Sequence, residues 1–361
     1  MKESFLNQLK EEVRKRRNQI VFGNHDNLRF PRAPAVRLRE LGVLLLKKTG
    51  LDPRKEDLEA RLEPYQKKQK DWEWLYQALA DEESRRLLLN LLCYRILGPR
   101  RVSLVSVSRQ WPQAVRQMKT LRISGMKQSI GSGPLASVEQ FRWPTDSEQI
   151  RLFCHPLNLI NTFCLEQYAT RIEDGRIQVR PGDVVVDGGG CWGDTALYFA
   201  EKAGKTGKVH AFEFSPTNLG LFKRNLGLNP ELSDKIKIHP FALSDQTGQE
   251  LFFEESGAGT HLKQEEGNCR ATTKTIDDWR KEERIGKVDF IKLDIEGFEI
   301  PALRGACRTI DQCRPTLAVA AYHRMEDLFE IPKEILKIKK DYKIYLRHFT
   351  IHSEETVVYA A

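Results

Sequence analysis

Residues 184–195 read VVVDGGGCWGDT, and this stretch decides the fold. Three valines predict a buried strand that ends at the carboxylate Asp187, and a glycine-rich turn leads into a helix near Thr195. Glycines let the backbone turn sharply and approach a ligand closely. This order of strand, turn and helix predicts the first unit of an α/β domain that binds a cofactor.

The sequence beyond this stretch alternates short apolar strands with amphipathic helices, which predicts βαβ units around a parallel sheet. After Tyr342 the pattern changes to two strands with no helix between them. We therefore expect a mostly parallel sheet with an antiparallel C-terminal strand over residues 151–361, as in class I methyltransferases. The expected strands are 183–187, 208–214, 236–242, 288–294, 316–321, 343–349 and 355–360, and the expected helices are 195–203, 217–226 and 300–310.

Residues 1–150 predict a separate, mostly helical region, because 361 residues exceed what one hydrophobic core usually organises. Apolar residues recur at helical spacing in four segments, and Asp81 or Ser84 is suited to cap the last of them. Residues 101–150 contain short β-prone pieces such as 102–107. The four expected helices are 3–20, 36–48, 57–79 and 84–97.

This N-terminal region carries the excess positive charge, with 29 Lys and Arg against 18 Asp and Glu, while the whole chain has a net charge of +8. A basic region can bind an anionic lipid, a phosphorylated carrier or nucleic acid. It can also consist of solvated helix faces, which the mixture of both signs favours. We expect a role in acceptor binding or homo-oligomer assembly, with at most peripheral membrane contact.

The composition is that of a soluble globular protein, with 40% apolar and 30% charged residues. The N-terminus lacks the pattern of a signal peptide, and no apolar run is long enough to span a bilayer. Seven cysteines without a CxxC pair indicate neither a disulfide framework nor a zinc site. These features predict a cytoplasmic protein with reduced thiols.

The glycine-rich turn also matches the dinucleotide fingerprint GxGxxG through Gly188, Gly190 and Gly193. Spacing alone therefore leaves an NAD-dependent oxidoreductase open. A carboxylate at Asp187 would repel a pyrophosphate, whereas it suits the ammonium and sulfonium charges of S-adenosylmethionine. We expect this turn, Gly189 included, to bind that cofactor, with Trp192 adding a cation–π contact or simply packing.

Two later strand ends complete the predicted cofactor site. Glu213 follows the second strand, where a carboxylate can accept both ribose hydroxyls. Residues 241–245, FALSD, follow the third strand, and we expect Leu243 and Ser244 to form the adenine wall.

Taken together, these stretches resemble the FkbM family of methyltransferases over about residues 160–361. The resemblance implies S-adenosylmethionine-dependent O-methylation of hydroxyls on sugars, glycans or polyketides. Phe214 departs from the family pattern, which commonly has proline after the glutamate. This difference affects only the expected geometry of the loop, so we keep Phe214 in the predicted cofactor site. The matching stretches are 187–195, 212–213, 225–226, 242–245, 275–277, 288–299 and 303–306.

The chemical centre is predicted at the end of the fourth strand, in residues 292–297, KLDIEG. Asp294 and Glu296 face the same way on a strand. Such acids can orient a hydroxyl, share a proton or hold Mg²⁺, or they can cap the next helix. We assign Asp294 to both the cofactor site and the catalytic site, and Glu296 to the catalytic site.

Methyl transfer to a hydroxyl benefits from a general base, and histidine suits this task near neutral pH. His323 and His348 each follow a predicted strand, so both can reach the ligand-binding edge of the sheet. We rank His323 first, His348 second and His261, in a glycine-rich loop, third. A structural role is the alternative for each.

The sequence therefore predicts an O-methyltransferase whose acceptor is a hydroxyl-bearing small molecule or glycan. The rivals are an NAD-dependent oxidoreductase and a non-catalytic binding protein on a methyltransferase scaffold. A nucleic-acid methyltransferase is less favoured, since neither a base-flipping motif nor an RNA-binding module is present.

Overall fold

The computed structural model describes residues 4–19, 21, 58–130, 137–146, 149–173, 175–254, 261–263 and 269–361. The helix expected at 36–48 and the loop before His261 lie outside the described residues. The chain forms two compact units, each described by itself below. The first contains Met1–Trp111 and Thr350–Ser353, and the second contains Pro112–Phe349 and Glu354–Ala361.

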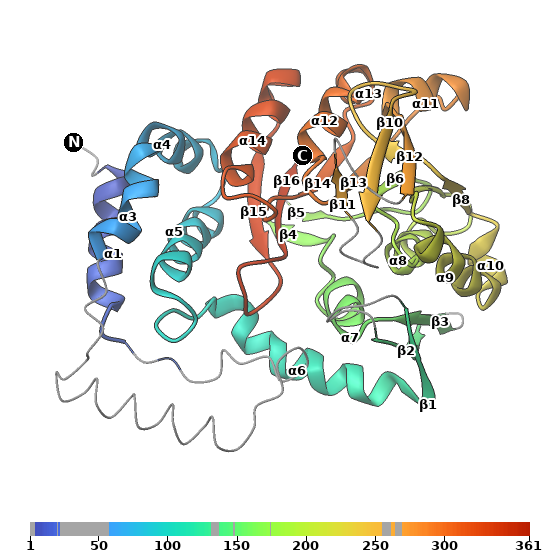
Figure 1. The fold of residues 1–361 in the computed structure, drawn as a ribbon, viewed down its shortest axis with the longest axis horizontal. Helices are drawn as coiled ribbons and strands as arrows, with labels where there is room; N and C mark the ends of the chain where they lie inside the picture. Colours follow the sequence, from blue (N-terminus) through green and yellow to red (C-terminus); the bar gives the residue numbers. More distant parts are fainter. Residues whose placement is uncertain are drawn as a thin grey trace. The chain divides into compact units, whose positions relative to one another are not determined.

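The first unit is helical in its described part (Figure 1). One face of its first helix buries Phe5, Leu9 and Val13, which recur every four residues. Asp81 caps a later helix by accepting a hydrogen bond from the Ser84 backbone N at 2.8 Å, as predicted. The helix expected over 57–79 is interrupted at Lys68. The helices are α1 (Phe5–Arg16), α3 (Leu58–Lys67), α4 (Gln69–Ala78) and α5 (Glu82–Leu97).

Helix α6 (Val105–Leu121) replaces the β-prone piece expected at 102–107, so that prediction was wrong. Trp111, Ala114 and Met118 are buried along it at helical spacing, and this apolar stripe outweighs the local β-propensity. A three-stranded antiparallel sheet follows, inside a region that we expected to be mostly helical. It contains β1 (Arg122–Ser129), β2 (Ser137–Pro144) and β3 (Gln149–Cys154).

A seven-stranded sheet with the order β15-β16-β14-β13-β6-β7-β8 forms the centre of the second unit. The pairs from β14 to β8 are parallel, while β16 is antiparallel to both of its neighbours. The predicted parallel sheet and closing hairpin are confirmed. The strands are β6 (Val184–Gly188), β7 (Lys208–Phe212), β8 (Ile236–His239), β13 (Phe290–Leu293), β14 (Thr316–Ala320), β15 (Ile344–His348) and β16 (Thr356–Ala360).

Helices cover both faces of this sheet, which is why its central strands are almost wholly apolar. In Figure 1, α8, α9 and α10 lie on one side, and α12, α13 and α14 lie on the other. The helices are α7 (Pro156–Asn158), the π-helix η1 (Leu159–Cys164), α8 (Asp194–Lys202), α9 (Pro216–Gly227), α10 (Pro230–Ser233), α11 (Ile276–Glu282), α12 (Glu299–Arg304), α13 (Cys307–Cys313) and α14 (Asp327–Ile338).

Two small sheets were not predicted from the sequence. One has the order β11-β10-β12-β9, and the other pairs β4 with β5. Within the described residues, every helix is too short or too polar to cross a bilayer. The strands are β4 (Thr170–Ile172), β5 (Gly175–Ile177), β9 (Ala242–Leu243), β10 (Glu250–Glu254), β11 (His261–Lys263) and β12 (Cys269–Lys274).

Candidate active site

The glycine-rich turn between β6 and α8 passes very close to neighbouring elements. Gly189 has a φ of +81°, and a Cβ added to it would lie 2.0 Å from the backbone oxygen of Asp294. Gly193 also has a φ of +81°, and its Cβ would lie 2.3 Å from the ring of Phe222. Only glycine fits both the conformation and the space at these positions. The turn is thereby held against the end of β13.

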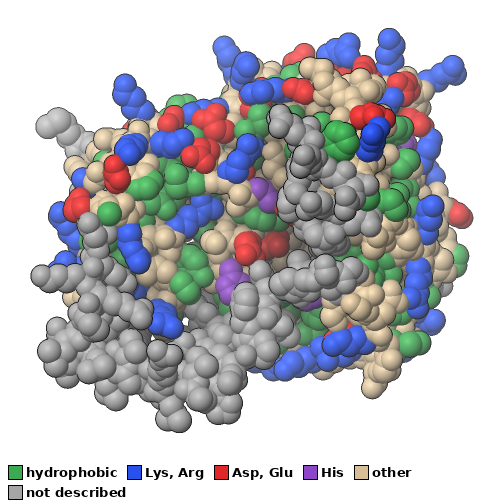
Figure 2. Space-filling view, viewed as in Figure 1, with side chains coloured by type: hydrophobic (Ala, Val, Ile, Leu, Met, Phe, Trp, Pro, Cys, Tyr) green, Lys and Arg blue, Asp and Glu red, His purple; other side chains and the backbone are tan. Residues whose placement is uncertain are grey.

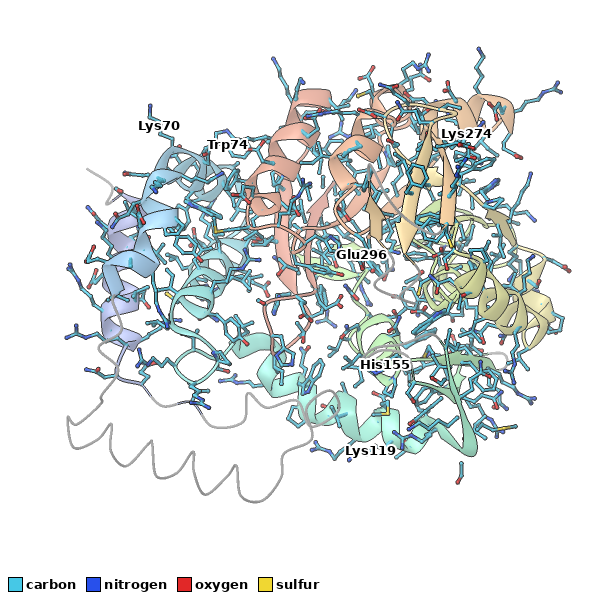
Figure 3. All side chains as sticks on the ribbon, viewed as in Figure 1. Lys70, Trp74, Lys119, His155, Lys274 and Glu296 are labelled. Carbon is cyan, nitrogen blue, oxygen red and sulfur yellow. The ribbon has the colours of Figure 1, made fainter. Side chains whose placement is uncertain are left out.

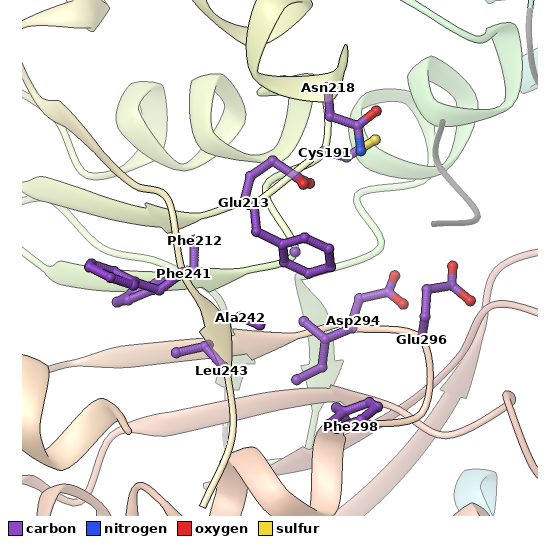
Figure 4. A pocket seen from close by; sticks show the side chains of 13 residues that line it. Cys191, Phe212, Glu213, Asn218, Phe241, Ala242, Leu243, Asp294, Glu296 and Phe298 are labelled. Carbon is purple, nitrogen blue, oxygen red and sulfur yellow. The ribbon is translucent and has the colours of Figure 1, made fainter. Parts of the chain in front are cut away.

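A pocket of about 550 Å³, including its open mouth, lies at this carboxyl edge of the sheet. Figure 4 shows Glu213 on one wall and Asp294 and Glu296 on the other, with Phe241 and Leu243 to one side. The lining includes six residues assigned from the sequence: Gly189, Glu213, Phe214, Leu243, Asp294 and Glu296. The other lining residues are Cys191, Phe212, Asn218, Phe241, Ala242, Ile295 and Phe298.

Glu213 is buried directly after β7, and its carboxylate is held in place by its own loop. Its Oε1 accepts a hydrogen bond from the backbone N of Ser215 at 2.7 Å. Burial raises the pKa of Glu213 to about 7, although hydrogen bonds from Ser215 and Asn218 act in the opposite direction. A held carboxylate in a pocket wall can accept hydrogen bonds from a diol.

The apolar wall of the pocket comes from the segment after β8. Phe241, Ala242 and Leu243 line it, while Ser244 is buried outside the lining, with its hydroxyl 3.3 Å from Asp245 Oδ1. Phe214 packs edge-on against Phe253 with their ring centroids 4.9 Å apart. A flat apolar surface of this kind suits a heterocyclic base.

Asp187 does not line the pocket, contrary to expectation, because Lys292 engages it inside the sheet. The two residues are register partners on β6 and β13, and Lys292 Nζ lies 3.1 Å from Asp187 Oδ1. Thr195 Oγ1 donates to Asp187 Oδ2 at 2.7 Å. Lys292 Nζ also donates to the backbone oxygen of Gly189 at 2.7 Å. The pair therefore positions the glycine turn, and a direct contact of Asp187 with the cofactor stays a prediction.

Four further residues of the predicted cofactor site lie outside the lining. Trp192 is fully buried, and its Nε1 donates to Asn218 Oδ1 at 3.0 Å, which supports the packing role and not a cation–π contact. Gly188, Gly190 and Gly193 shape the turn behind the pocket.

Asp294 is held by two tyrosines that the sequence analysis did not assign to the site. Tyr168 Oη donates to Oδ2 at 3.2 Å, and Tyr322 Oη donates to Oδ1 at 3.0 Å. Tyr168 lies 126 residues from Asp294 in the chain, outside every motif. Both hydroxyls fix the carboxylate's orientation toward the pocket.

Glu296 is the most accessible carboxylate of this wall (Figure 3), with a side chain 32% exposed. Its φ of 55° is unusual for a residue other than glycine, and such strain is often found at functional sites. Burial raises the pKa of Glu296 to about 7, while the neighbouring His323 lowers it.

His323 lies beside Asp294 as predicted, but carboxylates face both of its ring nitrogens. Nδ1 is 3.2 Å from Glu299 Oε1, and Nε2 is 3.4 Å from Glu296 Oε2 and 3.6 Å from Asp294 Oδ1. Burial opposes the imidazolium, yet these three carboxylates outweigh it and raise the pKa of His323 to about 9. Red and purple side chains meet near the middle of the face in Figure 2. A protonated imidazole does not accept a proton, so these surroundings disfavour His323 as a free base, and that role stays a prediction.

Of the other two histidine candidates, His348 does not line the pocket. His348 ends β15, is buried, and has Nδ1 2.9 Å from Thr356 Oγ1. His261 begins β11, whose side chains lie outside the described part of the structure. A group suited to a cation is instead formed by Asp294, Glu299 and His323, whose ligand atoms lie within 4.8 Å of one another.

Comparison with known families adds a direct result. Residues 176–344 match the model of the methyltransferase FkbM domain. Residues 176–344 therefore form a methyltransferase domain of the FkbM family. The match covers β6, Glu213, Asp294 and His323, and it favours a methyltransferase over the NAD-dependent rival. None of the curated proteins matches the chain.

Solved structures of methyltransferases are similar to this chain, and the first of those named here supports the methyltransferase fold. The methyltransferase FkbM from Methylobacillus flagellatus is 20% identical, with a TM-score of 0.55 over 94% of this chain and 72% of that one. Aeropyrum pernix fibrillarin in complex with S-adenosyl-L-methionine is 14% identical, with a TM-score of 0.33 over 51% and 68%. Precorrin-6y C5,15-methyltransferase from Geobacter metallireducens is 10% identical, with a TM-score of 0.37 over 58% and 88%.

Proposed function

We propose that this protein is an S-adenosylmethionine-dependent O-methyltransferase that acts on a hydroxyl of a sugar, glycan or polyketide-like compound. The observation that carries the proposal is one pocket with two chemically different walls. Glu213 and the apolar segment form one wall, and Asp294 with Glu296 forms the other. The first wall suits an adenosine, and the second suits a polar acceptor.

Glu213 would hold the ribose of the cofactor, because its carboxylate can accept hydrogen bonds from the two hydroxyls. The adenine lies against Phe241 and Leu243, with Phe214 beside it. The glycine turn would let the backbone approach the rest of the cofactor closely. This arrangement directs the methyl group toward Asp294 and Glu296.

In the proposed reaction S-adenosylmethionine would supply the methyl group to the acceptor oxygen, and its sulfur would take the electron pair of the carbon–sulfur bond. The hydroxyl proton passes to the Glu296 carboxylate. This role falls to Glu296 because its side chain is accessible, whereas carboxylates flank both nitrogens of His323. Most of the acceleration comes from holding the two reactants in line.

The acidic wall also supports a polyhydroxylated, uncharged acceptor. Carboxylates accept hydrogen bonds from hydroxyls, but they repel the phosphates of a nucleic acid. We retain the helical N-terminal region as a contributor to acceptor binding or assembly, and a cytoplasmic location, as further parts of this proposal.

Calorimetry with S-adenosylhomocysteine and NADH tests the cofactor assignment. Wild type is expected to bind S-adenosylhomocysteine and not NADH. Glu213→Gln should bind at least about tenfold more weakly, since a charge-assisted acceptor is lost. Glu283→Gln, a half-buried carboxylate of the same domain that pairs with Lys237 and does not line the pocket, is the matched control. Binding of NADH alone, or equal affinity in both variants, would refute the assignment.

Radiolabelled methyl transfer to a panel of sugars, glycans and polyketide alcohols tests the reaction. Label in an alkali-stable methyl ether supports O-methylation. Cofactor binding without transfer to any hydroxyl compound, but with transfer to an amine or thiol, would refute it.

A further inference from the structure

Glu299, on the first turn of α12, is a buried carboxylate with one unpartnered oxygen. Its side chain is only 1% exposed. Oε1 accepts hydrogen bonds from the backbone N of Ile295 at 2.8 Å and of Gly297 at 3.4 Å. Oε2 has no hydrogen-bond partner among the described residues. Buried carboxylate oxygens are normally satisfied, so this atom indicates a missing partner.

The side chains around Glu299 supply the other ligands of a cation site. Asp294, at the end of β13, and His323, after β14, come from the adjacent ends of parallel strands. One atom from each of Asp294, Glu299 and His323 can be chosen so that all lie within 4.8 Å of one another. Metal–ligand bonds of about 2.0–2.2 Å require spacings somewhat below this value, which small side-chain adjustments provide.

Among the described residues, carboxylates outnumber the cations that contact this group. Asp294, Glu296 and Glu299 surround one imidazole. The nearby cations are engaged elsewhere. Lys292 is 3.1 Å from Asp187, and Arg324 Nε is 3.1 Å from Asp327 Oδ1. A divalent cation would supply the charge that the surrounding side chains lack.

We propose that Asp294, Glu299 and His323 bind a divalent cation, with Glu296 at its pocket side. Two carboxylates and one imidazole match Mn²⁺ or a similar first-row ion. The hydroxyls of Tyr168 and Tyr322 orient the Asp294 ligand, as groups behind a metal ligand commonly do. On binding, the cation displaces a proton from the imidazole.

The position of the cation site also suggests its role in catalysis. That role rests on the proposed methyltransferase function, whereas the site itself does not. Asp294 and Glu296 line the pocket, so the cation would lie directly behind the acceptor wall. Three protein ligands leave coordination positions open, and an acceptor hydroxyl can occupy one of them. A hydroxyl bound there would lose its proton more readily.

Mn²⁺ binding to the full-length chain, stripped with EDTA, tests the proposal. We expect one equivalent of Mn²⁺, with the ¹⁴N modulation of a single imidazole in pulsed electron paramagnetic resonance. Glu299→Gln keeps the acceptor for the two backbone N–H groups but should weaken binding at least about tenfold. Glu334→Gln, a buried carboxylate that pairs with Arg304, is the matched control and should bind as wild type does.

Absence of stoichiometric Mn²⁺ binding, absence of nitrogen modulation, or equal affinity in Glu299→Gln would overturn the proposal. If Glu299→Gln does not fold, the nitrogen modulation in wild type and the affinity of His323→Asn decide instead. S-adenosylhomocysteine affinity is measured on the same stripped protein. Cofactor binding without Mn²⁺ binding would remove this site and leave the proposed methyltransferase, whereas the reverse result would remove the cofactor assignment.

Discussion

Two groups of buried polar side chains in the same sheet have opposite electrostatic designs. At the ends of β13 and β14, His323 is surrounded by carboxylates, which raise its pKa to about 9 despite burial. Between β7 and β8, His210 Nδ1 lies 3.1 Å from His239 Nε2, and burial lowers the pKa of both to about 4. Trp279 Nε1 completes this second group by donating to His239 Nε2 at 3.2 Å.

The difference shows that the environment, and not the residue type or its place in the sheet, decides what a buried histidine does. The charged group faces the pocket and keeps an excess of carboxylates for chemistry. The neutral group has aromatic neighbours and lies outside the pocket lining, and hydrogen bonds link its three members. We therefore expect changes in the charged group to affect turnover or to expose uncompensated charge, and changes in the neutral group to affect stability alone.

The largest expected effect comes from breaking the ion pair behind the glycine turn. Asp187→Ala leaves Lys292 buried without its carboxylate, which should lower the free energy of unfolding by about 3–5 kcal/mol. Adding Lys292→Met removes the unpaired charge and should recover much of that loss. Urea unfolding measures both variants. A loss below about 1 kcal/mol in the single variant would show that Lys292 reaches water or another anion.

Glu296→Gln should lower the single-turnover rate of methyl transfer by about 100-fold, since amides do not accept the hydroxyl proton. S-adenosylhomocysteine affinity should stay within about twofold, because a base acts in the transition state. Glu283→Gln is the control. Near-normal turnover of Glu296→Gln would show that Asp294 or solvent, and not Glu296, accepts the hydroxyl proton.

These outcomes bear on how far the sequence alone leads. Glu213, Asp294 and Glu296 could be placed in the pocket because each follows a recognisable parallel strand, and the ends of such strands meet at one edge. Asp187 satisfies the same rule, yet its role depends on the neighbouring Lys292. That neighbour can be identified only from the register of β6 and β13. Strand patterns do not specify such cross-strand partners.

Other parts of the site lie outside local patterns altogether. Tyr168 reaches Asp294 across 126 residues from a region without a motif. The protonation of His323 depends on three carboxylates together. The rule that functional residues follow parallel strands does not predict this arrangement. By contrast, the apolar stripe of α6 was visible in the sequence and was obscured by local β-propensity at residues 102–107.

In the neutral group, His239→Phe should lower the free energy of unfolding by about 1–3 kcal/mol, because Trp279 Nε1 loses its buried acceptor. Turnover per folded molecule should not change, since His239 lies outside the pocket. Adding Trp279→Phe should cost little more, as the unsatisfied donor is then removed. Reduced turnover in folded His239→Phe would mean that the two groups are coupled.

The smallest and most specific effect is the pH dependence that the neutral group contributes. A histidine whose pKa falls from 6.5 unfolded to about 4 folded stabilises the protein fully above pH 6.5. That contribution decreases as the pH falls toward 4, because the unfolded chain binds the proton first. The slope approaches about 1.4 kcal/mol per pH unit for each histidine.

Glu283 favours the charged form of both histidines, while Lys237 opposes it and Lys208 also opposes it at His210. The free energy of unfolding should therefore fall more steeply with decreasing pH in wild type than in His239→Phe. Carboxylates elsewhere titrate in both proteins, so the difference between the two curves reports His239 together with its effect on the pKa of His210. Urea unfolding at several values between pH 7 and pH 4.5 provides it, and parallel curves would show that His239 titrates alike in the folded and unfolded chain.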